Sequence, residues 1–390
     1  METRNVYLDN NAATRADEQV VRRMDLFHET DFAVASSQFS HTPGIRAKDA
    51  VEQSRETIAG SLGAGTEEIV FTSGETESNN LALFGLARGN KDKRRKRIVI
   101  SAVEHFSVLH TAERLAREGY EVVKAGVDGE GFVDTDALAG LVDDRTLLVS
   151  VMHANHEVGT LQDLAAVSAV AHSNGAYFHT DASYSYLQVP IDVEKTGIDL
   201  LSADANKVHG PKGSGILYVK KNVPVSKLFE GGYQEYNMRP GTENVPGIAG
   251  FGKAVEIWND GDVRRTATLR DALKKMLTEG IEDTMINGPQ DMNRRIANNL
   301  NVSFRYIEGE SVVLHLDMRG IAVITGSACF SRALQASHVL LAMGFTHERA
   351  HGSIRFSPSK YTTPEDITYA YENVKEVVTR LRELSPVGTV

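Results

Sequence analysis

The chain has 390 residues, of which 41% are hydrophobic and 24% are charged. This length exceeds what one simple core needs and indicates two domains of an α/β enzyme. The formal net charge of −10 argues against a general nucleic-acid binder, which carries a basic footprint. No apolar run approaches the roughly 18 residues that span a bilayer, so we expect no membrane contact. The start “METRNVYLDNNAAT” lacks an apolar leader, and the single cysteine, Cys329, excludes an internal disulfide. Both features predict a cytoplasmic protein.

Short β-branched segments alternate with amphipathic segments over the first 260 residues. Strands are expected at 67–73, 96–103, 121–127, 146–152, 176–182 and 198–204, and helices at 77–89, 108–120 and 164–175. Such alternation predicts an α/β fold with a parallel sheet and helices on both of its faces. Beyond about residue 260 helices and strands mix in another order, which predicts a smaller α+β unit. We expect a large domain of residues 16–260, and a small domain of residues 1–15 and 261–390.

Polar residues follow five of the expected strands, in “TSGETESNN”, “AVEHFS”, “HANHEVG”, “HTDASYS” and “ADANK”. Ligands of parallel sheets bind outside the carboxyl ends of the strands, so these segments are expected to converge on one site. The first places small and hydroxyl residues before a helix, where free N–H groups and the helix dipole bind phosphate. An ordinary N-cap by Ser73 or Thr76, with Glu75 and Glu77 complementing the dipole, explains the same pattern.

A carboxylate and a lysine stand at two further strand ends. Asp181 follows “AYFHT”, and Lys207 stands after the apolar “GIDLLSA” and just before a glycine–proline bend. Taken singly, Asp181 could cap the next segment, and Lys207 could be a solvated surface lysine. Together with the phosphate segment they make the set that a pyridoxal phosphate enzyme uses. Such an enzyme needs a lysine for the Schiff base, a carboxylate for the pyridinium nitrogen and donors for the phosphate.

Three features nearer the C-terminus also carry candidate chemistry. Cys329 stands among small and polar residues in “ITGSACFSRALQ”, which favours a reactive thiol over a buried apolar side chain. Arg355, in “GSIRFS”, is either a strand-edge surface charge or a bidentate clamp for a substrate carboxylate. The segment “HERAH” at 347–351 matches a zinc-binding pattern. Gly352 and an expected strand follow it at once, so no metal site is predicted.

In order from about residue 6 to residue 370, the chain resembles the cysteine desulfurases of the NifS/IscS group, which belong to the class V aminotransferases. The resemblance implies a fold-type I homodimer whose large domain has a mainly parallel, seven-stranded sheet and binds pyridoxal 5'-phosphate. It also implies conversion of L-cysteine to L-alanine, with the sulfur left as a persulfide on an enzyme cysteine and passed to an acceptor protein. The segments that carry it include “YLDNNAAT”, “FTSGETESNNLAL”, “SAVEHFSVL”, “VMHANHEVGTLQD”, “HTDASYSYLQVPID”, “NKVHGPKGSGILYV”, “GTENVPGIAGFGKA”, “TGSACFSR” and “GSIRFSPSKYTTPEDI”.

The resemblance implies a role for each matching residue. Lys207 matches the Schiff-base lysine, Asp181 the carboxylate on the pyridinium nitrogen, and His105 the histidine that stacks on the ring and assists proton transfer. Cys329 matches the persulfide cysteine of a group that carries it on a mobile loop, here about residues 326–337. The other matches are Thr76, Gly74 and Glu75 at the phosphate, Thr242 reaching the phosphate from the other subunit, and Asn155 and Arg355 at the substrate carboxylate.

The pocket departs from the family pattern at four positions. Asp204 and Asn206 stand where the family has serine and histidine beside the lysine. Tyr184 replaces a glutamine that bonds the ring hydroxyl, and it can still donate through its phenol. A second asparagine after Asn155 is replaced by His156. We expect Tyr184, Asp204 and Asn206 to lie at the cofactor, and a carboxylate there repels a dianionic phosphate unless it is paired or turned away. Our hypothesis is that Asp204 weakens cofactor retention.

Three functions stay open at this point. The first is a cysteine desulfurase that donates sulfur to iron–sulfur cluster assembly, tRNA thiolation or DNA phosphorothioation. The second is a pyridoxal phosphate-dependent cysteine or selenocysteine lyase, which does not need Cys329. The third is a weakly active homologue that scaffolds a partner such as an iron–sulfur assembly protein. Because a sulfur donor reaches nucleic acid only through its partner, we expect no direct contact with nucleic acid.

Overall fold

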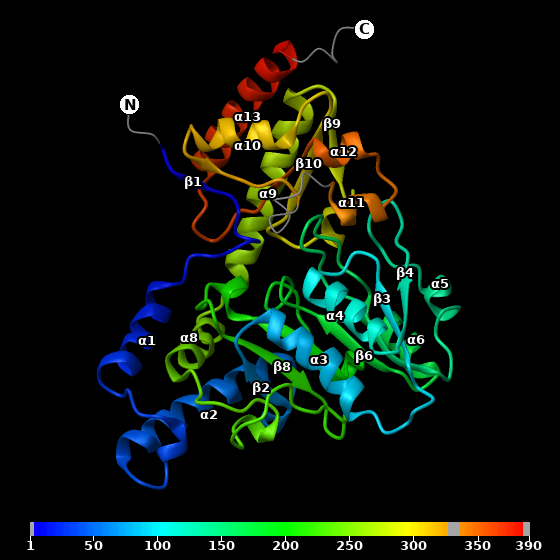
Figure 1. Cartoon of the computed structure of the whole chain (residues 1–390). Coiled ribbons are helices and arrows are strands. Elements are labelled where there is room, and N and C mark those ends of the chain that lie inside the picture. The colour runs from blue at the N-terminus through cyan, green and yellow to red at the C-terminus, as the bar shows by residue number, and fades with distance from the viewer. Residues whose placement is uncertain (1–3, 327–335, 385–390) are drawn as a thin grey trace.

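A computed structural model describes residues 4–326 and 336–384 of the chain. Figure 1 shows a large sheet with helices in the lower half and a smaller sheet packed with helices in the upper half. The α-helices are α1 (Glu18–Glu29), α2 (Thr42–Leu62), α3 (Glu75–Gly89), α4 (Phe106–Arg117), α5 (Thr135–Ala139), α6 (Leu164–Ser173), α7 (Val193–Thr196), α8 (Val245–Glu256), α9 (Asp260–Gly280), α10 (Gly309–Asp317), α11 (His338–Ala342), α12 (His347–His351) and α13 (Pro364–Leu384). The β-strands are β1 (Val6–Tyr7), β2 (Ile69–Thr72), β3 (Arg97–Ser101), β4 (Glu121–Ala125), β5 (Thr146–Ser150), β6 (Tyr177–Asp181), β7 (Leu200–Asp204), β8 (Gly215–Val219), β9 (Thr284–Asn287), β10 (Leu300–Phe304), β11 (Ile321–Ala322) and β12 (Ser353–Phe356).

The large sheet has seven strands in the order β2-β8-β7-β6-β5-β3-β4. β7, β6, β5, β3 and β4 run parallel, whereas β8 is antiparallel to both of its neighbours. Every residue of β2, β5 and β8 is buried, as expected for a sheet covered on both faces. The prediction of a mainly parallel, seven-stranded sheet flanked by helices is confirmed. The strand pattern missed β8, which returns after ten residues, a connection too short for a parallel neighbour.

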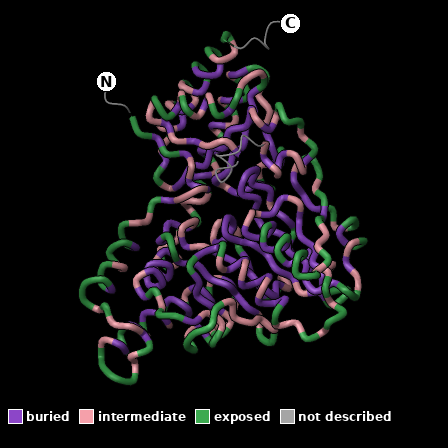
Figure 2. Tube along the Cα trace, viewed as in Figure 1, coloured by how far each residue is buried: buried purple, intermediate pink, exposed green. Residues whose placement is uncertain are grey.

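Separate apolar clusters fill the two halves of the molecule. One face of the large sheet packs against α2, α6 and α8, and the other face packs against α3 and α4. A further cluster joins α9, α10 and α13 to the small sheet, whose order is β12-β10-β9. Figure 2 shows the buried strands enclosed by helices whose outer turns are exposed. β1 pairs in parallel with β11, Val6 opposite Ile321, so the first residues of the chain pack with the C-terminal half. The domain boundaries expected from the sequence stay a prediction.

The end of β7 sets the position of Lys207. Asp204 closes the strand, and its carboxylate accepts the N–H of Asn206 at 2.7 Å, which caps a one-turn 3-10 helix over Ala205–Val208. That helix stops at His209, whose φ of +62° is left-handed. Lys207 therefore stands in a tight turn at the carboxyl edge of the sheet, where ligands of such sheets gather.

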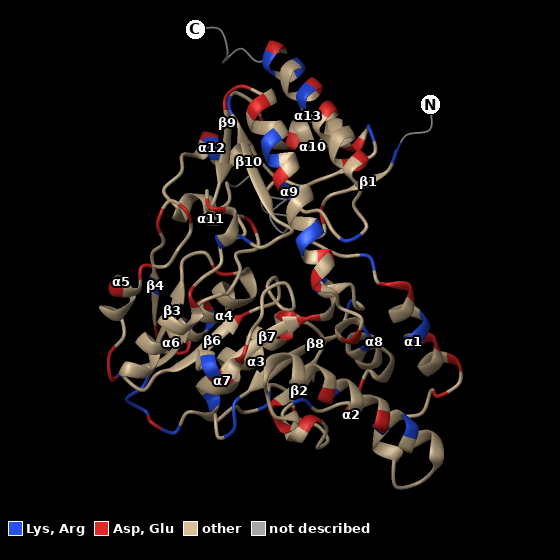
Figure 3. Ribbon diagram, turned by 180° about the vertical axis from the view of Figure 1, so that it is seen from behind, with Lys and Arg blue, Asp and Glu red and all other residues tan. Residues whose placement is uncertain are grey.

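Charges of both signs are mixed on the outer helices. Figure 3 shows acidic and basic residues close together along α1, α2 and α13. In residues 4–326 and 336–384, no helix is both long enough and apolar enough to cross a membrane.

Candidate active site

Tyr184 lies at the centre of a group of polar side chains at the carboxyl edge of the large sheet. It is 6% exposed, and the Lys207 Nζ lies 4.8 Å from the centroid of its ring. The ring of His156 lies 5.8 Å away, centroid to centroid. Burial raises the pKa of the Tyr184 phenol well above its ordinary value, and the negative charge of Glu75 adds to the shift. The phenol therefore keeps its proton and can donate a hydrogen bond.

Lys207 is held by the N-terminal segment. Its Nζ donates to the backbone carbonyls of Asn11 and Ala12, each at 2.8 Å. The residue is half-buried, so the interpretation as a solvated surface lysine is wrong. Its two hydrogen-bond acceptors are neutral carbonyls rather than carboxylates, which makes the amine easier to release for reaction than a salt-bridged one.

Asp181 and His105 are joined by a chain of hydrogen bonds. Asp181 is fully buried at the end of β6. It accepts the Nδ2 of Asn79 at 2.7 Å and the backbone N–H of Ser183 at 3.0 Å. The Asn79 Nδ2 also donates to the Ser107 Oγ at 2.8 Å, and this hydroxyl lies 2.8 Å from the His105 Nδ1. This chain of hydrogen bonds fixes the orientation of the Asp181 and His105 side chains.

Sequence analysis did not select Asn79 or Ser183. Asn79 stands on α3, one turn after Glu75, in the quoted “GETESNN”, and its position next to Asp181 depends on the packing of α3 against the sheet. Within the described part of the chain, the Asn79 Oδ1 is buried without a hydrogen-bond partner. An unpaired buried polar atom of this kind leaves room for a further hydrogen bond beside Asp181.

The N-terminus of α3 already holds an anion, which is the carboxylate of Asp204. The helix begins at Glu75 with Gly74 at the N-cap, so the alternative explanation, a cap by Ser73 or Thr76, is wrong. The N–H of Glu75 donates to the Asp204 Oδ2 at 3.1 Å. A Cβ on Gly74 would lie 3.0 Å from the same oxygen, and the Gly74 φ of +144° is itself one that side chains disfavour. The Asp204 carboxyl group therefore points toward the expected phosphate position and lies next to it. Burial raises its pKa.

Glu75 lies in the same buried space. Burial raises its pKa to about 8, and the charges of Asp181 and Asp204 contribute, while Lys207 opposes the shift. Its Oε1 lies 3.3 Å from the His105 Nδ1. At neutral pH the group holds a proton, so it adds little negative charge beside α3.

Two further carboxyl groups, Glu104 and Glu157, are fully buried behind this space. Burial raises the pKa of Glu104 to about 8, although the Ser101 Oγ donates to it at 2.5 Å and the N–H of Met152 at 2.7 Å. Burial also raises the pKa of Glu157 to about 7, against the opposing effects of a hydrogen bond from Ser337 and of the charge of Arg355. Both residues lie in strand-end segments that the sequence pattern selected, but neither was chosen as a site residue.

Arg355 is 2% exposed, so the interpretation as a surface charge is wrong. It donates to the His156 carbonyl at 3.0 Å and to the Asp9 carboxylate at 2.8 Å. Its Nε is buried and has no partner among the described residues, so this N–H is available to a carboxylate. The amide of Asn155 is engaged elsewhere, because it accepts the N–H groups of Glu157 and Val158 and donates to a carbonyl in the segment after β3.

The remaining predicted site residues are Asn206, Thr76, Thr242 and Cys329. The Asn206 amide bonds the N-terminal segment, accepting the N–H of Thr14 at 3.3 Å and donating to the Ala12 carbonyl at 3.4 Å. Thr76 and Thr242 are exposed in the single chain. Cys329 and most of the expected loop at 326–337 lie outside the described residues.

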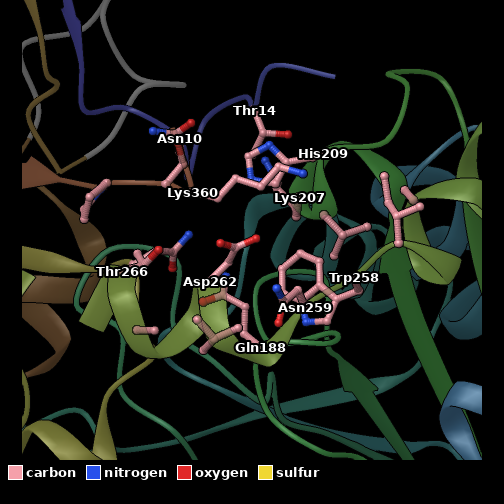
Figure 4. Close-up of a pocket in the computed structure, with 18 residues that line it drawn as sticks. Asn10, Thr14, Gln188, Lys207, His209, Trp258, Asn259, Asp262, Thr266 and Lys360 are labelled. Carbon is pink, nitrogen blue, oxygen red and sulfur yellow. The ribbon is translucent and has the colours of Figure 1, made fainter. Parts of the chain in front are cut away.

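A cavity of about 40 Å³ borders Lys207. Figure 4 shows Lys207, Thr14 and His209 on one side of it, and Trp258 and Asp262 on the other. This volume is large enough for an ordered water molecule, and the cavity lies between the lysine turn and the start of α9.

The segment “HERAH” forms α12, a helix of five residues. Its two histidine rings stack with centroids 6.4 Å apart. Over the described ranges, no group of three or more His, Cys, Asp or Glu side chains is arranged to hold a metal ion.

Comparison with known proteins gives consistent matches along the chain. The model of the family Aminotransferase class-V matches residues 6–369. The cysteine desulfurase IscS of Dictyoglomus turgidum is 44% identical over 386 residues, which are 98% of this chain and 97% of that protein. The cysteine desulfurase IscS of Methanosarcina thermophila is also 44% identical, over 99% of this chain and 95% of its own. A solved NifS-like protein matches with a TM-score of 0.89 at 36% identity and covers 97% of this chain and 100% of its own.

The buried carboxyl group of Glu104 predicts a fall in stability above neutral pH. Its pKa is about 8 in the folded protein against 4.5 ordinarily, so between these values the folded protein holds a proton that the unfolded chain releases. The free energy of unfolding therefore falls as pH rises through this window. Below pH 6.5 neutral buried histidines such as His153 oppose the trend. We expect the melting temperature of the cofactor-free protein to fall between pH 6.5 and 8, and Glu104→Gln to reduce that fall.

Glu113→Gln, at an exposed position of α4, is the control and should keep the wild-type slope. A Glu104→Gln protein with the full wild-type slope would contradict the assignment.

Proposed function

Since the chain belongs to the class-V aminotransferase family and, within it, to the pyridoxal phosphate-dependent cysteine desulfurases, we propose that it converts L-cysteine to L-alanine and keeps the sulfur as a persulfide on Cys329. The observation that carries the proposal is the fully buried Asp181, whose hydrogen bonds come from two neutral donors. A buried carboxylate must either take a proton or meet a cationic partner. The protonated nitrogen of pyridoxal phosphate is such a partner.

The described residues fit three groups of this cofactor. The Lys207 amine, held by carbonyls, is available to the aldehyde. Asp181 would hold the ring nitrogen, and the Tyr184 phenol would donate a hydrogen bond to the ring hydroxyl. When bound, the cofactor supplies an electron sink for negative charge on the substrate carbon. The fit is poorest at the phosphate, where Asp204 already accepts the N–H of Glu75.

His105 moves the proton on the substrate carbon. The backbone N–H of Ser107 donates to its Nδ1 at 3.3 Å, which leaves the Nε2 to exchange a proton with the substrate. The link through Ser107 and Asn79 to Asp181 holds the ring in place. Lys207, once released from its carbonyl partners, is the second group that can carry this proton.

Arg355 holds the substrate carboxylate, with Asn155 shaping the turn beside it. The Cys329 thiolate then attacks the substrate sulfur. An S–S bond forms as the C–S bond of the substrate breaks, and the carbon keeps the electron pair and takes a proton. The products are L-alanine and the enzyme persulfide, whose outer sulfur passes to an acceptor protein.

We place this enzyme in the cytoplasm as a homodimer, in which the exposed Thr242 reaches the phosphate of the partner subunit. The acceptor serves iron–sulfur cluster assembly, tRNA thiolation or DNA phosphorothioation. The name IscS of the relatives does not select one of these three pathways. A cysteine or selenocysteine lyase is the second candidate, because the described site holds each group that such a lyase needs.

Lys207→Ala is expected to abolish cofactor attachment. The wild-type protein with pyridoxal phosphate should show a visible absorption band that shifts on addition of L-cysteine, and the variant should show neither the band nor the shift. A wild-type protein that stays colourless with added cofactor would contradict the enzyme assignment and favour the scaffold.

Cys329→Ser separates the desulfurase from the lyase. In a desulfurase the variant keeps the visible band but loses persulfide, and alanine formation falls by about 10² or more because the nucleophile is gone. Alanine is measured directly, and enzyme-bound sulfur is measured by mass. Full alanine formation by the variant would establish the lyase instead.

Asp204→Ser is expected to tighten cofactor binding. Removing a carboxylate from the N-terminus of α3 removes repulsion toward the phosphate, and we expect the Kd for pyridoxal phosphate to fall about tenfold, or about 1.4 kcal/mol. Asp204→Asn is the matched variant that keeps the acceptor oxygen for Glu75 and Asn206. Wild-type affinity in both variants would refute the hypothesis.

A further inference from the structure

The turn after β5 carries His156, a buried histidine at a position where the family pattern has an asparagine. The residue is 7% exposed. Its ring makes a T-shaped contact with the ring of His105, with centroids 5.5 Å apart, and lies 5.8 Å from the ring of Tyr184. Arg355 donates to its backbone carbonyl at 3.0 Å. His156 therefore lies among three residues of the candidate active site.

The two ring nitrogens of His156 have different surroundings. The Nε2 lies 3.6 Å from the Glu157 Oε1, whereas the Nδ1 is buried without a hydrogen-bond partner among the described residues. Burial lowers the pKa of the imidazole well below its ordinary value, and the charges of His105, His338 and Arg355 add to the shift. The ring is therefore neutral at physiological pH. A proton on the Nε2 faces the carboxyl oxygen and leaves the Nδ1 as a hydrogen-bond acceptor.

The thiol of L-cysteine is the substrate group that still lacks a hydrogen-bond partner in the proposed reaction. The amine reacts where Lys207 stands, Arg355 holds the carboxylate, and His105 exchanges the proton on the substrate carbon. A thiol has an ordinary pKa of about 8.5, so at neutral pH it keeps its proton. Its S–H group can donate to a free imidazole nitrogen. The unpaired Nδ1 of His156 thus matches the substrate group that is left.

We propose that His156 is a further substrate-contacting residue, whose Nδ1 accepts a hydrogen bond from the thiol of L-cysteine. The contact favours cysteine over amino acids that lack this group. The inference rests on the proposed conversion of L-cysteine, and it adds a determinant of substrate specificity to that reaction.

L-Cysteine and L-alanine differ only in the thiol, so a comparison of the two isolates this hydrogen bond. The cofactor-loaded protein is mixed rapidly with either amino acid, and Kd is taken from the first shift of the visible band, before turnover. For His156→Leu we expect the Kd for L-cysteine to rise about fivefold, as for the loss of one hydrogen bond, with the Kd for L-alanine unchanged. His156→Asn keeps a polar atom at the place of the Nδ1 and should stay within about twofold of the wild type.

His153→Leu is the matched control. His153 is also 7% exposed, and its Nδ1 likewise has no partner in the described ranges of the chain. The fall in its pKa comes from burial alone, without the charges of the site that act on His156. Its Kd values for both amino acids should equal those of the wild type.

A wild-type Kd for L-cysteine in His156→Leu overturns the proposal, and so does an equal loss of affinity for both amino acids. A His156→Asn protein as weak as His156→Leu assigns the loss to packing and overturns the hydrogen bond. Where His156→Leu fails to fold, His156→Phe keeps the ring contacts with His105 and Tyr184 and carries the same expectation. A wild-type band that does not shift with L-cysteine refutes the proposed function and this inference together. A band that shifts normally, with equal Kd ratios in wild type and variant, refutes the inference alone.

Discussion

Burial of acidic groups at the carboxyl edge of the large sheet is the constraint on which the site depends. Asp181, Glu104 and Glu157 are fully buried, and Glu75 is 9% exposed. A buried charge costs several kcal/mol unless it is paired, so each group must take a proton or meet a cation. Burial raises the pKa of the three glutamates, which holds them neutral over part of the physiological range. Asp181, with neutral donors on both oxygens, is the group suited to a cationic ring.

Asp204 shows how one residue serves two local needs that conflict. Its Oδ1 caps the turn that positions Lys207, and its Oδ2 accepts the N–H of Glu75 at the N-terminus of α3. The first bond builds Lys207 into the sheet edge, and the second occupies the position that favours a phosphate. A serine could cap the turn without bringing a charge. The carboxylate therefore orders both the lysine turn and the N-terminus of α3.

Much of this arrangement follows from patterns within short stretches of sequence. Alternating strands and helices placed Asp181, Lys207 and His105 at strand ends, and parallel strands bring such ends together. Asn79 escaped prediction because its role arises from the packing of α3 against Asp181, a residue 102 positions away. The alternative explanation, a cap by Ser73 or Thr76, is wrong for a related reason. Asp204, 129 residues away from Glu75, supplies the acceptor that a local cap would have provided.

Both halves of the molecule contribute to the part of the site around Arg355. Arg355 comes from β12, whose neighbour β10 carries Asn301, and both residues bond the turn that holds His156 and Glu157. This turn follows β5 of the large sheet, so the small sheet fixes a loop of the large one. The Asn155 amide completes the same turn. Its position in the family pattern therefore has a reason that needs no contact with substrate: it shapes the turn that carries His156 and Glu157.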